Sequence, residues 1–177
     1  RDREESLSLF KGEIALDAAK GRSLVLAFLP PPGSPDATEI PAACEALRAG
    51  VRAAAPDADF VFLPADPSPL DTKSLADRLA GDAGGGGGPY AQAVALTYDA
   101  HFRPAQEGLA RLVEESVSEF SVVAMRDPYD AAFFPRARGL AAAYGFTAAG
   151  ALAVARLLAG DGAPKGLCPV QVIGLEV

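Results

Sequence analysis

The hydrophobic residues of this chain fall into short, nearly continuous runs that alternate with amphipathic stretches. The apolar runs predict buried strands. Strands are expected at 23–29, 59–63, 91–96 and 121–125, with a last one at 170–177. Apolar residues at helical spacing predict the intervening helices. Helices are expected at 38–55, 74–79, 104–120 and 148–159, and 6–10 is either a short strand or the segment that leads into the domain.

This alternation of strands and helices determines the fold class. Strands that are apolar throughout are typical of parallel sheets covered on both faces. We therefore predict an α/β protein, a three-layer α/β/α sandwich with a mostly parallel sheet of five to six strands in a flavodoxin-like layout. The 177 residues fit one domain. The glycine-rich run at 81–89 has few side chains that could pack, so we interpret it as a flexible surface loop within that domain.

Charge and hydropathy exclude several classes of partner. The formal net charge is −7, and no basic cluster offsets it. Binding to a phosphate backbone requires clustered Lys and Arg, so nucleic acid and anionic membrane surfaces are not expected as partners. No apolar run reaches the length of a transmembrane helix, so the sequence predicts no membrane span.

The cysteine and histidine content offers little for a metal site. Cys44 and Cys168 are interpreted as buried free thiols, although the sequence leaves a disulfide between them open. With His101 as the single histidine there are too few soft ligands for structural zinc, and we predict no metal and no cofactor. The thiols do not fix the compartment, for which we prefer a secreted or cell-envelope location. Because the single methionine is Met125 and the chain begins at Arg1, we expect a piece of a longer protein.

Motifs for nucleotide binding and nucleophilic catalysis do not occur in this sequence. The first predicted strand leads into PPPG at 30–33, where prolines remove the backbone donors that a pyrophosphate would use. The glycine run lacks the Lys-Ser/Thr of a phosphate loop, and there is no G-x-S-x-G elbow. His101 follows the third strand, and it is the one histidine that could serve a nucleophile as a base.

A polar turn, Arg126-Asp127-Pro128-Tyr129-Asp130, follows the fourth predicted strand. Pro128 fixes its own φ and disfavours helical angles at Asp127, so the turn is stiff. Ligands and partner surfaces gather at the carboxyl ends of strands in open α/β sheets. Asp127 and Asp130 are therefore either caps of the turn and of the next helix or members of a contact surface, with acid/base catalysis as a third possibility.

Further landmarks follow this turn in a fixed order. They are AYGF at 143–146, an alanine-rich helix that ends in LAG at 158–160, and KGLCPV at 165–170. In this order they resemble the carboxyl-terminal domain of family 3 glycoside hydrolases, in particular the bacterial β-N-acetylglucosaminidase (β-hexosaminidase) branch. The sequence departs from the family pattern at Asp127, where the family usually has Asn, and at Cys168, where it usually has Leu.

This resemblance implies a two-domain enzyme in which a catalytic (β/α)8 barrel precedes a domain of this kind. The nucleophile and acid/base motifs of that barrel are absent from this sequence, so the resemblance implies no catalytic residue here and no activity of the chain alone. The implied role is to pack on the barrel and shape the rim of its active site, with the barrel and an amino-sugar substrate as partners. The candidate contact residues are His101, Arg126, Asp127, Tyr129 and Asp130.

A second hypothesis follows from the residues without the resemblance. An independent α/β domain could bind a small ligand or a divalent cation at the ends of its third and fourth strands. Carboxylate oxygens are the ligands that hard cations prefer. The residues for this site would be Asp99, His101, Asp127 and Asp130.

Overall fold

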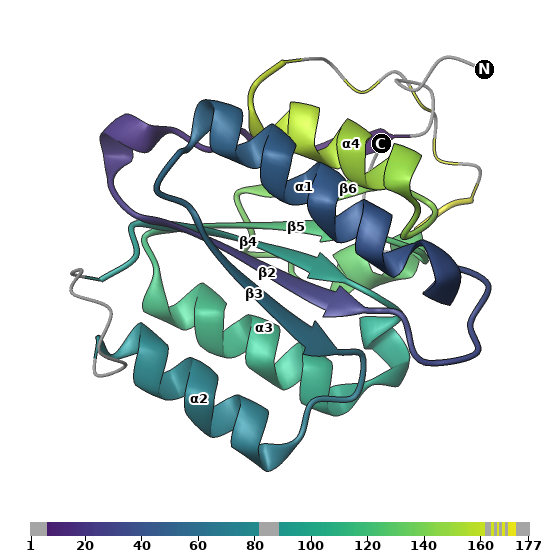
Figure 1. Ribbon diagram of the computed structural model, residues 1–177, viewed down its shortest axis with the longest axis horizontal. Helices are drawn as coiled ribbons and strands as arrows, with labels where there is room; N and C mark the ends of the chain where they lie inside the picture. The colour runs from purple at the N-terminus through teal and green to yellow at the C-terminus, as the bar shows by residue number, and fades with distance from the viewer. Residues whose placement is uncertain are drawn as a thin grey trace.

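The computed structural model describes residues 7–81, 89–161, 164, 166, 168 and 170–172 (Figure 1). A six-stranded sheet with the order β1-β6-β5-β4-β2-β3 forms its centre. β1 is antiparallel to β6, and the other neighbouring pairs are parallel. The strands are β1 Ser8–Lys11, β2 Ser23–Leu29, β3 Asp59–Pro64, β4 Gln92–Thr97, β5 Glu119–Ala124 and β6 Gly139–Ala142. The α-helices are α1 Ile40–Ala54, α2 Pro69–Leu79, α3 Pro104–Ser116 and α4 Ala148–Leu158.

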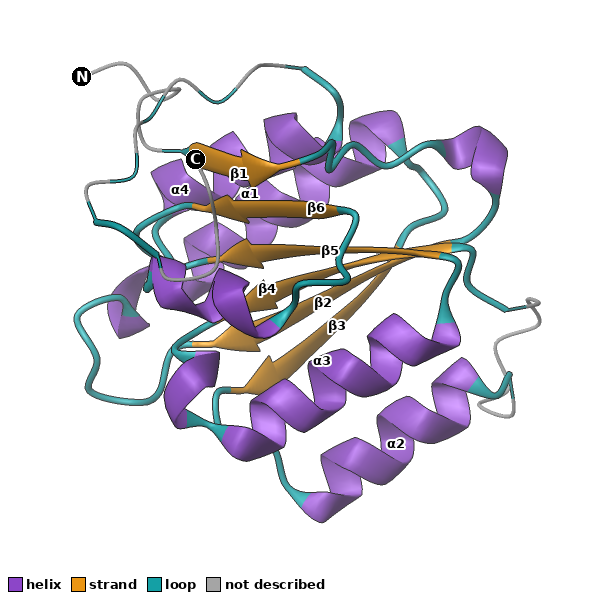
Figure 2. Cartoon of the chain, turned by 180° about the vertical axis from the view of Figure 1, so that it is seen from behind, coloured by secondary structure: helices purple, strands orange, loops and turns teal. Residues whose placement is uncertain are grey.

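Helices cover both faces of this sheet. α1 and α4 lie on one face, and α2 and α3 lie on the other (Figures 1 and 2). Counted from β2, the parallel strands have the order 2-1-3-4-5 across the sheet, which is the flavodoxin-like order. The predicted three-layer α/β/α sandwich with a mostly parallel sheet is therefore confirmed.

Small and branched aliphatic side chains form the core around the central strands. Every residue of β4 is buried, and so is every residue of β5 after Glu119. Val25, Leu26 and Val122 are completely inaccessible to solvent. Each such side chain stabilises the fold by about 1.5–3 kcal/mol through burial of apolar surface. Helices packed on both faces thus hold the central strands, and with them the segments that follow their carboxyl ends.

The antiparallel edge of the sheet differs from the prediction. The short strand at 6–10, left open in the sequence, is β1, and it pairs with β6 through Ser8 and Ala142. The sequence predicts no strand at β6, because its four residues GLAA are too few to show a period. Residues 170–172 are not in a strand, so the predicted last strand is wrong there, and 173–177 lie outside the described residues.

Two helix boundaries also differ from the prediction. α2 begins at Pro69 rather than at 74, because Ser68 and Asp71 form a capping box in which each side chain accepts from the other's backbone N–H. α3 ends at Ser116 rather than at 120, because β5 begins at Glu119. The helix predicted at 148–159 agrees with α4, which Thr147 caps by accepting from the N–H of Gly150. Most of the glycine-rich run, at 82–88, lies outside the described residues.

Two further expectations concern the cysteines and the membrane. Cys44 and Cys168 are free thiols, each half-buried. Burial raises the pKa of the Cys44 thiol, and the nearby Arg48 partly opposes that rise. Among the helices that the structure describes, none has both the length and the apolar character that crossing a membrane requires.

Candidate functional site at the carboxyl edge of the sheet

Two polar segments meet where β4 and β5 end. These strands are parallel neighbours, and the register pairs Thr97 with Ala124 at their carboxyl ends (Figure 2). β4 continues into the 3-10 helix η4 (Ala100–Phe102), which carries His101. β5 continues through the predicted polar turn into the 3-10 helix η5 (Pro128–Phe133). The topology therefore brings the single histidine to the stiff turn.

The buried Asp130 carboxylate fixes the orientation of His101. Asp130 Oδ1 lies 2.6 Å from His101 Nδ1 and also accepts a 3.0 Å hydrogen bond from the His101 backbone N–H. The side chain of Asp130 is completely buried, and that of His101 is 11% exposed. With the proton of the imidazole on Nδ1, this contact is a hydrogen bond from His101 to the carboxylate, and Nε2 is the imidazole nitrogen left for other contacts.

Asp127 combines the two roles that the sequence left open. Its Oδ1 accepts a 3.0 Å hydrogen bond from the Tyr129 N–H and so caps η5. Its Oδ2 lies 3.7 Å from His101 Nε2, which is an ion-pair distance when the imidazole is protonated. The structure thus brings His101 next to both Asp127 and Asp130, two of the candidate residues that follow the neighbouring strand.

Aromatic side chains flank the imidazole at the surface. Tyr129 is 40% exposed, and its ring centroid lies 6.3 Å from that of His101 in an edge arrangement. Phe102 is 77% exposed, and its ring centroid lies 3.9 Å from that of His101. Phe102 is not among the site residues predicted from the sequence, although a phenylalanine next to the single histidine at a strand end is a usable signal. Exposed aromatic side chains that lie together are typical of contact surfaces.

Arg126 is directed to Asp99 rather than to the imidazole. Its Nη1 donates a 2.8 Å hydrogen bond to Asp99 Oδ2, and its guanidinium carbon lies 5.5 Å from the centroid of the Tyr98 ring. The Asp99 carboxylate raises the pKa of Arg126 because it stabilises the charged guanidinium. Asp99 has a left-handed backbone, with φ of 56°, which Asp adopts more readily than most residues. This ion pair ties the ends of β4 and β5 together.

The cation-binding hypothesis does not match this arrangement. It needs Asp99, His101, Asp127 and Asp130 to converge, but Asp99 pairs with Arg126 and Asp130 lies under the imidazole. In the part of the chain that the structure describes, no group of three or more His, Cys, Asp or Glu side chains could hold a metal ion. Nor does any Ser, Thr or Cys within the described ranges hydrogen-bond to the imidazole. The cluster can hold and orient an imidazole, but it presents no nucleophile to it.

A hydrogen-bond network joins the chain at a second position on this edge. Flavodoxin-like folds bind ligands at the point where the strand order reverses, which here lies between β2 and β4. Tyr98, completely buried, follows β4 and donates a 3.2 Å hydrogen bond to Asp36 Oδ2. The same oxygen accepts a 3.1 Å hydrogen bond from the Phe146 N–H. Side chains and backbone of three connecting segments therefore join across this position.

Solved structures of family 3 glycoside hydrolases contain a similar fold. A β-N-acetylglucosaminidase of this family from Paenibacillus sp. str. FPU-7 matches 93% of this chain with a TM-score of 0.70 and 22% identity. A fungal multi-domain β-N-acetylglucosaminidase of this family, with a GCN5-related glucosamine N-acetyltransferase region, matches 99% with a TM-score of 0.69 and 15% identity. A β-glucosidase from Listeria innocua in complex with isofagomine matches 93% with a TM-score of 0.65 and 14% identity.

In each case the match covers a minor part of the solved structure. The shares are 30% of the Paenibacillus chain, 19% of the fungal chain and 25% of the Listeria chain. No protein-family model matches the sequence, and a search of curated proteins finds no match. The resemblance in the sequence is thus confirmed for the fold: this chain folds like one part of larger family 3 glycoside hydrolases.

Proposed function

We propose that this chain is the carboxyl-terminal domain of a family 3 glycoside hydrolase of the β-N-acetylglucosaminidase type, without catalytic residues of its own. It packs on a catalytic barrel and shapes the rim of the active site. The observation that carries this proposal is the exposed aromatic pair Phe102 and Tyr129 beside a fixed imidazole at the carboxyl edge. The chain's match to less than a third of each larger glycosidase supports it.

The chemistry of this edge favours a contact surface over a catalytic one. Aromatic side chains are enriched in protein interfaces, and their faces also pack against the apolar faces of sugar rings. Tyr129 offers a hydroxyl in addition to its ring, so it suits a rim that is apolar on one side and wet on the other. His101 is already engaged by Asp130, and its Nε2 is the nitrogen left to contact the barrel or an amino-sugar substrate.

An independent ligand-binding domain is less well supported than a docking domain. In a flavodoxin-like sheet, the crevice at the reversal of strand order receives the ligand. In this chain the buried Tyr98 joins the segment that follows β4 to Asp36, in the segment that follows β2, through a hydrogen bond. Phe102 and Tyr129 are apolar rings that stay accessible at this edge, which suits docking against another surface.

Two measurements test the proposal. The purified chain alone is expected to release no product from an aryl N-acetyl-β-glucosaminide, and turnover above a blank would overturn the noncatalytic role. In the full-length protein, Tyr129→Ala is expected to raise either KM or the rate at which a protease cuts between the domains. The expected increase is about tenfold, which is the effect of losing a central interface residue. The matched control is Leu70→Ala, an equally apolar truncation of a 75% exposed side chain on α2.

The two variants separate the contact role from a general effect of truncation. Leu70→Ala is expected to leave KM and protease sensitivity unchanged. If Tyr129→Ala behaves in the same way, the turn is not part of the rim and the proposal fails for this surface.

A further inference from the structure

β3 forms the edge of the sheet opposite to β1. Among the residues that the structure describes, β3 pairs with β2 and with no other strand, so one side of its backbone has no described strand partner. β3 is the strand nearest the viewer in Figure 1, between α1 and the α2–α3 layer. Its first four residues, 59–62, are half-buried, whereas every residue of β4 is buried. Phe60 and Phe62 are two residues apart on this strand, and their rings are parallel with centroids 6.2 Å apart.

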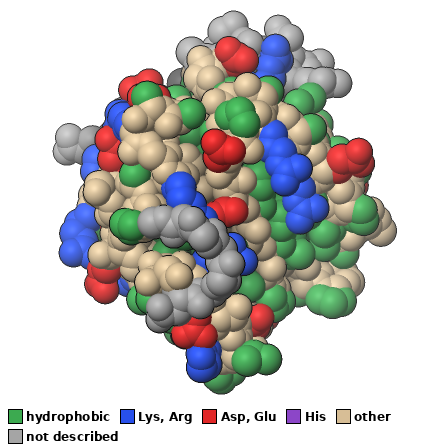
Figure 3. All heavy atoms as spheres, turned by 60° about the vertical axis from the view of Figure 1, so that its left-hand side comes forward, with side chains coloured by type: hydrophobic (Ala, Val, Ile, Leu, Met, Phe, Trp, Pro, Cys, Tyr) green, Lys and Arg blue, Asp and Glu red, His purple; other side chains and the backbone are tan. Residues whose placement is uncertain are grey.

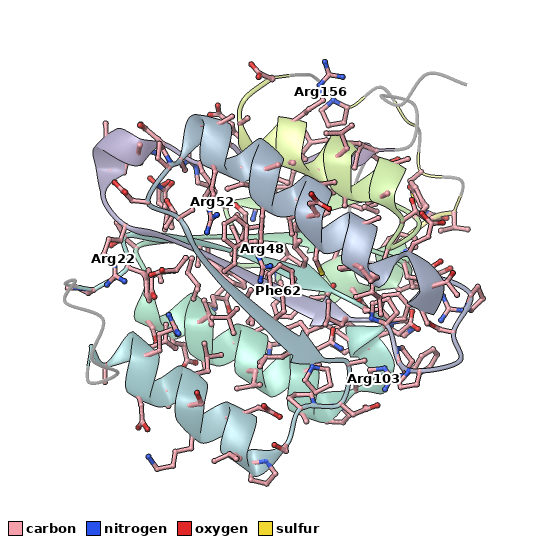
Figure 4. The ribbon with its side chains drawn as sticks, viewed as in Figure 1. Arg22, Arg48, Arg52, Phe62, Arg103 and Arg156 are labelled. Atoms are coloured by element: carbon pink, nitrogen blue, oxygen red, sulfur yellow. The ribbon has the colours of Figure 1, made fainter. Side chains whose placement is uncertain are left out.

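Two arginines of α1 lie over these rings. The Cζ atom of Arg48 is 4.5 Å from the Phe62 centroid, and that of Arg52 is 5.8 Å from the Phe60 centroid (Figure 4). Figure 3 shows basic side chains that lie across a hydrophobic band on one face of the molecule. A guanidinium stacked on a ring is held in place while its N–H donors stay available.

These arginines have no carboxylate partner among the residues with described positions. The chain has 23 acidic and 16 basic residues, so it contains more carboxylates than are needed to pair every Lys and Arg. Ion pairs do engage other arginines of this chain, such as Arg22, Arg103 and Arg126. Within the described ranges, the β3 edge therefore combines backbone groups that pair with no strand and positive charge that no carboxylate neutralises.

The spacing of the charges matches that of an added strand. Arg48 and Arg52 are one helical turn apart, about 6 Å along the axis. Residues that point to the same side of a strand are about 6.8 Å apart. A strand paired with β3 would place alternate side chains level with Phe60 and Phe62, each next to one guanidinium.

We propose that the β3 edge binds an extended segment of a partner protein, which carries carboxylates at alternate positions and adds to the sheet as a further strand. Backbone pairing would supply affinity, and the arginines would select the acidic sequence. A second copy of this chain is a poor occupant, because pairing β3 with β3 would bring Arg48 and Arg52 of both copies together. This proposal does not depend on the function proposed above.

A labelled peptide of alternating Glu and Val tests the charge requirement. Fluorescence anisotropy at low ionic strength is expected to show binding, and replacing each Glu by Gln is expected to abolish it. Arg48→Gln and Arg52→Gln should each weaken binding about threefold, and the double variant about tenfold, which are the effects of losing exposed ion pairs. Arg156→Gln is the matched control, because Arg156 is exposed on α4 and likewise has no ion-pair partner among the described residues (Figure 4).

N-methylated peptides test the strand pairing. Methyl groups on alternate residues block one side of the peptide backbone without changing its charge. One of the two alternate sets is expected to abolish binding and the other to retain it. Equal affinity for the Gln peptide, unchanged affinity of the double arginine variant, or the same response to both methylated sets would overturn the proposal. So would self-association of the double variant without peptide binding, since the arginines would then serve to keep the edge unpaired.

Discussion

Removal of the Asp130 carboxylate is the most direct test of how the His101 cluster is held. Asp130→Ala deletes the acceptor of two hydrogen bonds, at 3.0 Å from the His101 backbone N–H and 2.6 Å from Nδ1. A hydrogen bond to a charged group contributes about 1.5–3 kcal/mol. The imidazole is 11% exposed, so water replaces part of the Nδ1 bond in the variant. We therefore expect the free energy of unfolding to fall by about 3 kcal/mol, near the lower end of the sum of the two bonds.

A double-mutant cycle separates the two bonds. His101→Ala keeps the backbone N–H and removes the ring, so the coupling between His101→Ala and Asp130→Ala reports the Nδ1 bond. Urea unfolding of the four proteins at pH 7 is expected to give a coupling of about 1–2 kcal/mol. Asp127→Ala serves as the comparison. It removes the acceptor for the Tyr129 N–H and should lower the free energy of unfolding by about 1 kcal/mol.

Two results would refute this reasoning. A coupling below about 0.5 kcal/mol is within the range of independent sites and would mean that the imidazole does not depend on the buried carboxylate. The second result is that Asp130→Ala lowers the free energy of unfolding by no more than Asp127→Ala does. The buried hydrogen bonds would then contribute no more than an exposed cap. Either result would also weaken the interpretation of His101 as a fixed member of the contact surface.

Two further predictions concern packing and charge. Gly139→Ala should destabilise the fold by about 1–3 kcal/mol, because the new Cβ would lie 2.6 Å from the Glu13 carbonyl oxygen. Gly108→Ala, in α3 with nothing within 4 Å of the new Cβ, should stabilise the fold by about 0.5–1 kcal/mol. Denaturant unfolding of both variants measures this difference, and equal effects would contradict the prediction. The Lys20 hydrogen bond lowers the pKa of Glu119 from its ordinary 4.5, so this pair stabilises the fold above pH 4.5 and the gain disappears as the pH falls through the lowered pKa of the folded state. Lys20→Gln should therefore be less stable than the parent at neutral pH and approach it in acid, and a difference that stays constant with pH would disprove this assignment.

The layered fold could be predicted because its central strands carry their own signal. The run SLVLAFL at 23–29 is apolar at almost every position, which is typical of a strand with helices on both faces, and it forms β2 without a shift in its ends. β6 carries no such signal, because GLAA is short and could belong to any buried segment. It becomes a strand because β5 and β1 flank it and supply its hydrogen-bond partners. Tertiary pairing, rather than local preference, determines this element.

In the candidate site, too, the positions of residues along the chain could be predicted from the sequence, whereas their tertiary contacts could not. Sequence reasoning could place His101 and Asp130 at two strand ends, because each follows an apolar run. It could not predict that Asp130 is completely buried beneath the imidazole, because that depends on how η4 and η5 pack after their strands. Nor could it predict that Arg126 turns to Asp99, since that contact depends on the left-handed backbone at Asp99.

Hydrogen bonds to one carboxylate join three of the connecting segments at the carboxyl edge of the sheet. Asp36 follows β2, Tyr98 follows β4 and Phe146 follows β6, and one carboxylate oxygen joins all three connecting segments. Loss of Asp36 would remove the acceptor of both the Tyr98 hydroxyl and the Phe146 N–H, so this carboxylate stabilises the arrangement of the three segments. The result is a carboxyl edge whose connecting segments are fixed to one another. A surface that is already ordered loses little entropy when it docks, which is the property that the proposed contact surface at Phe102 and Tyr129 requires.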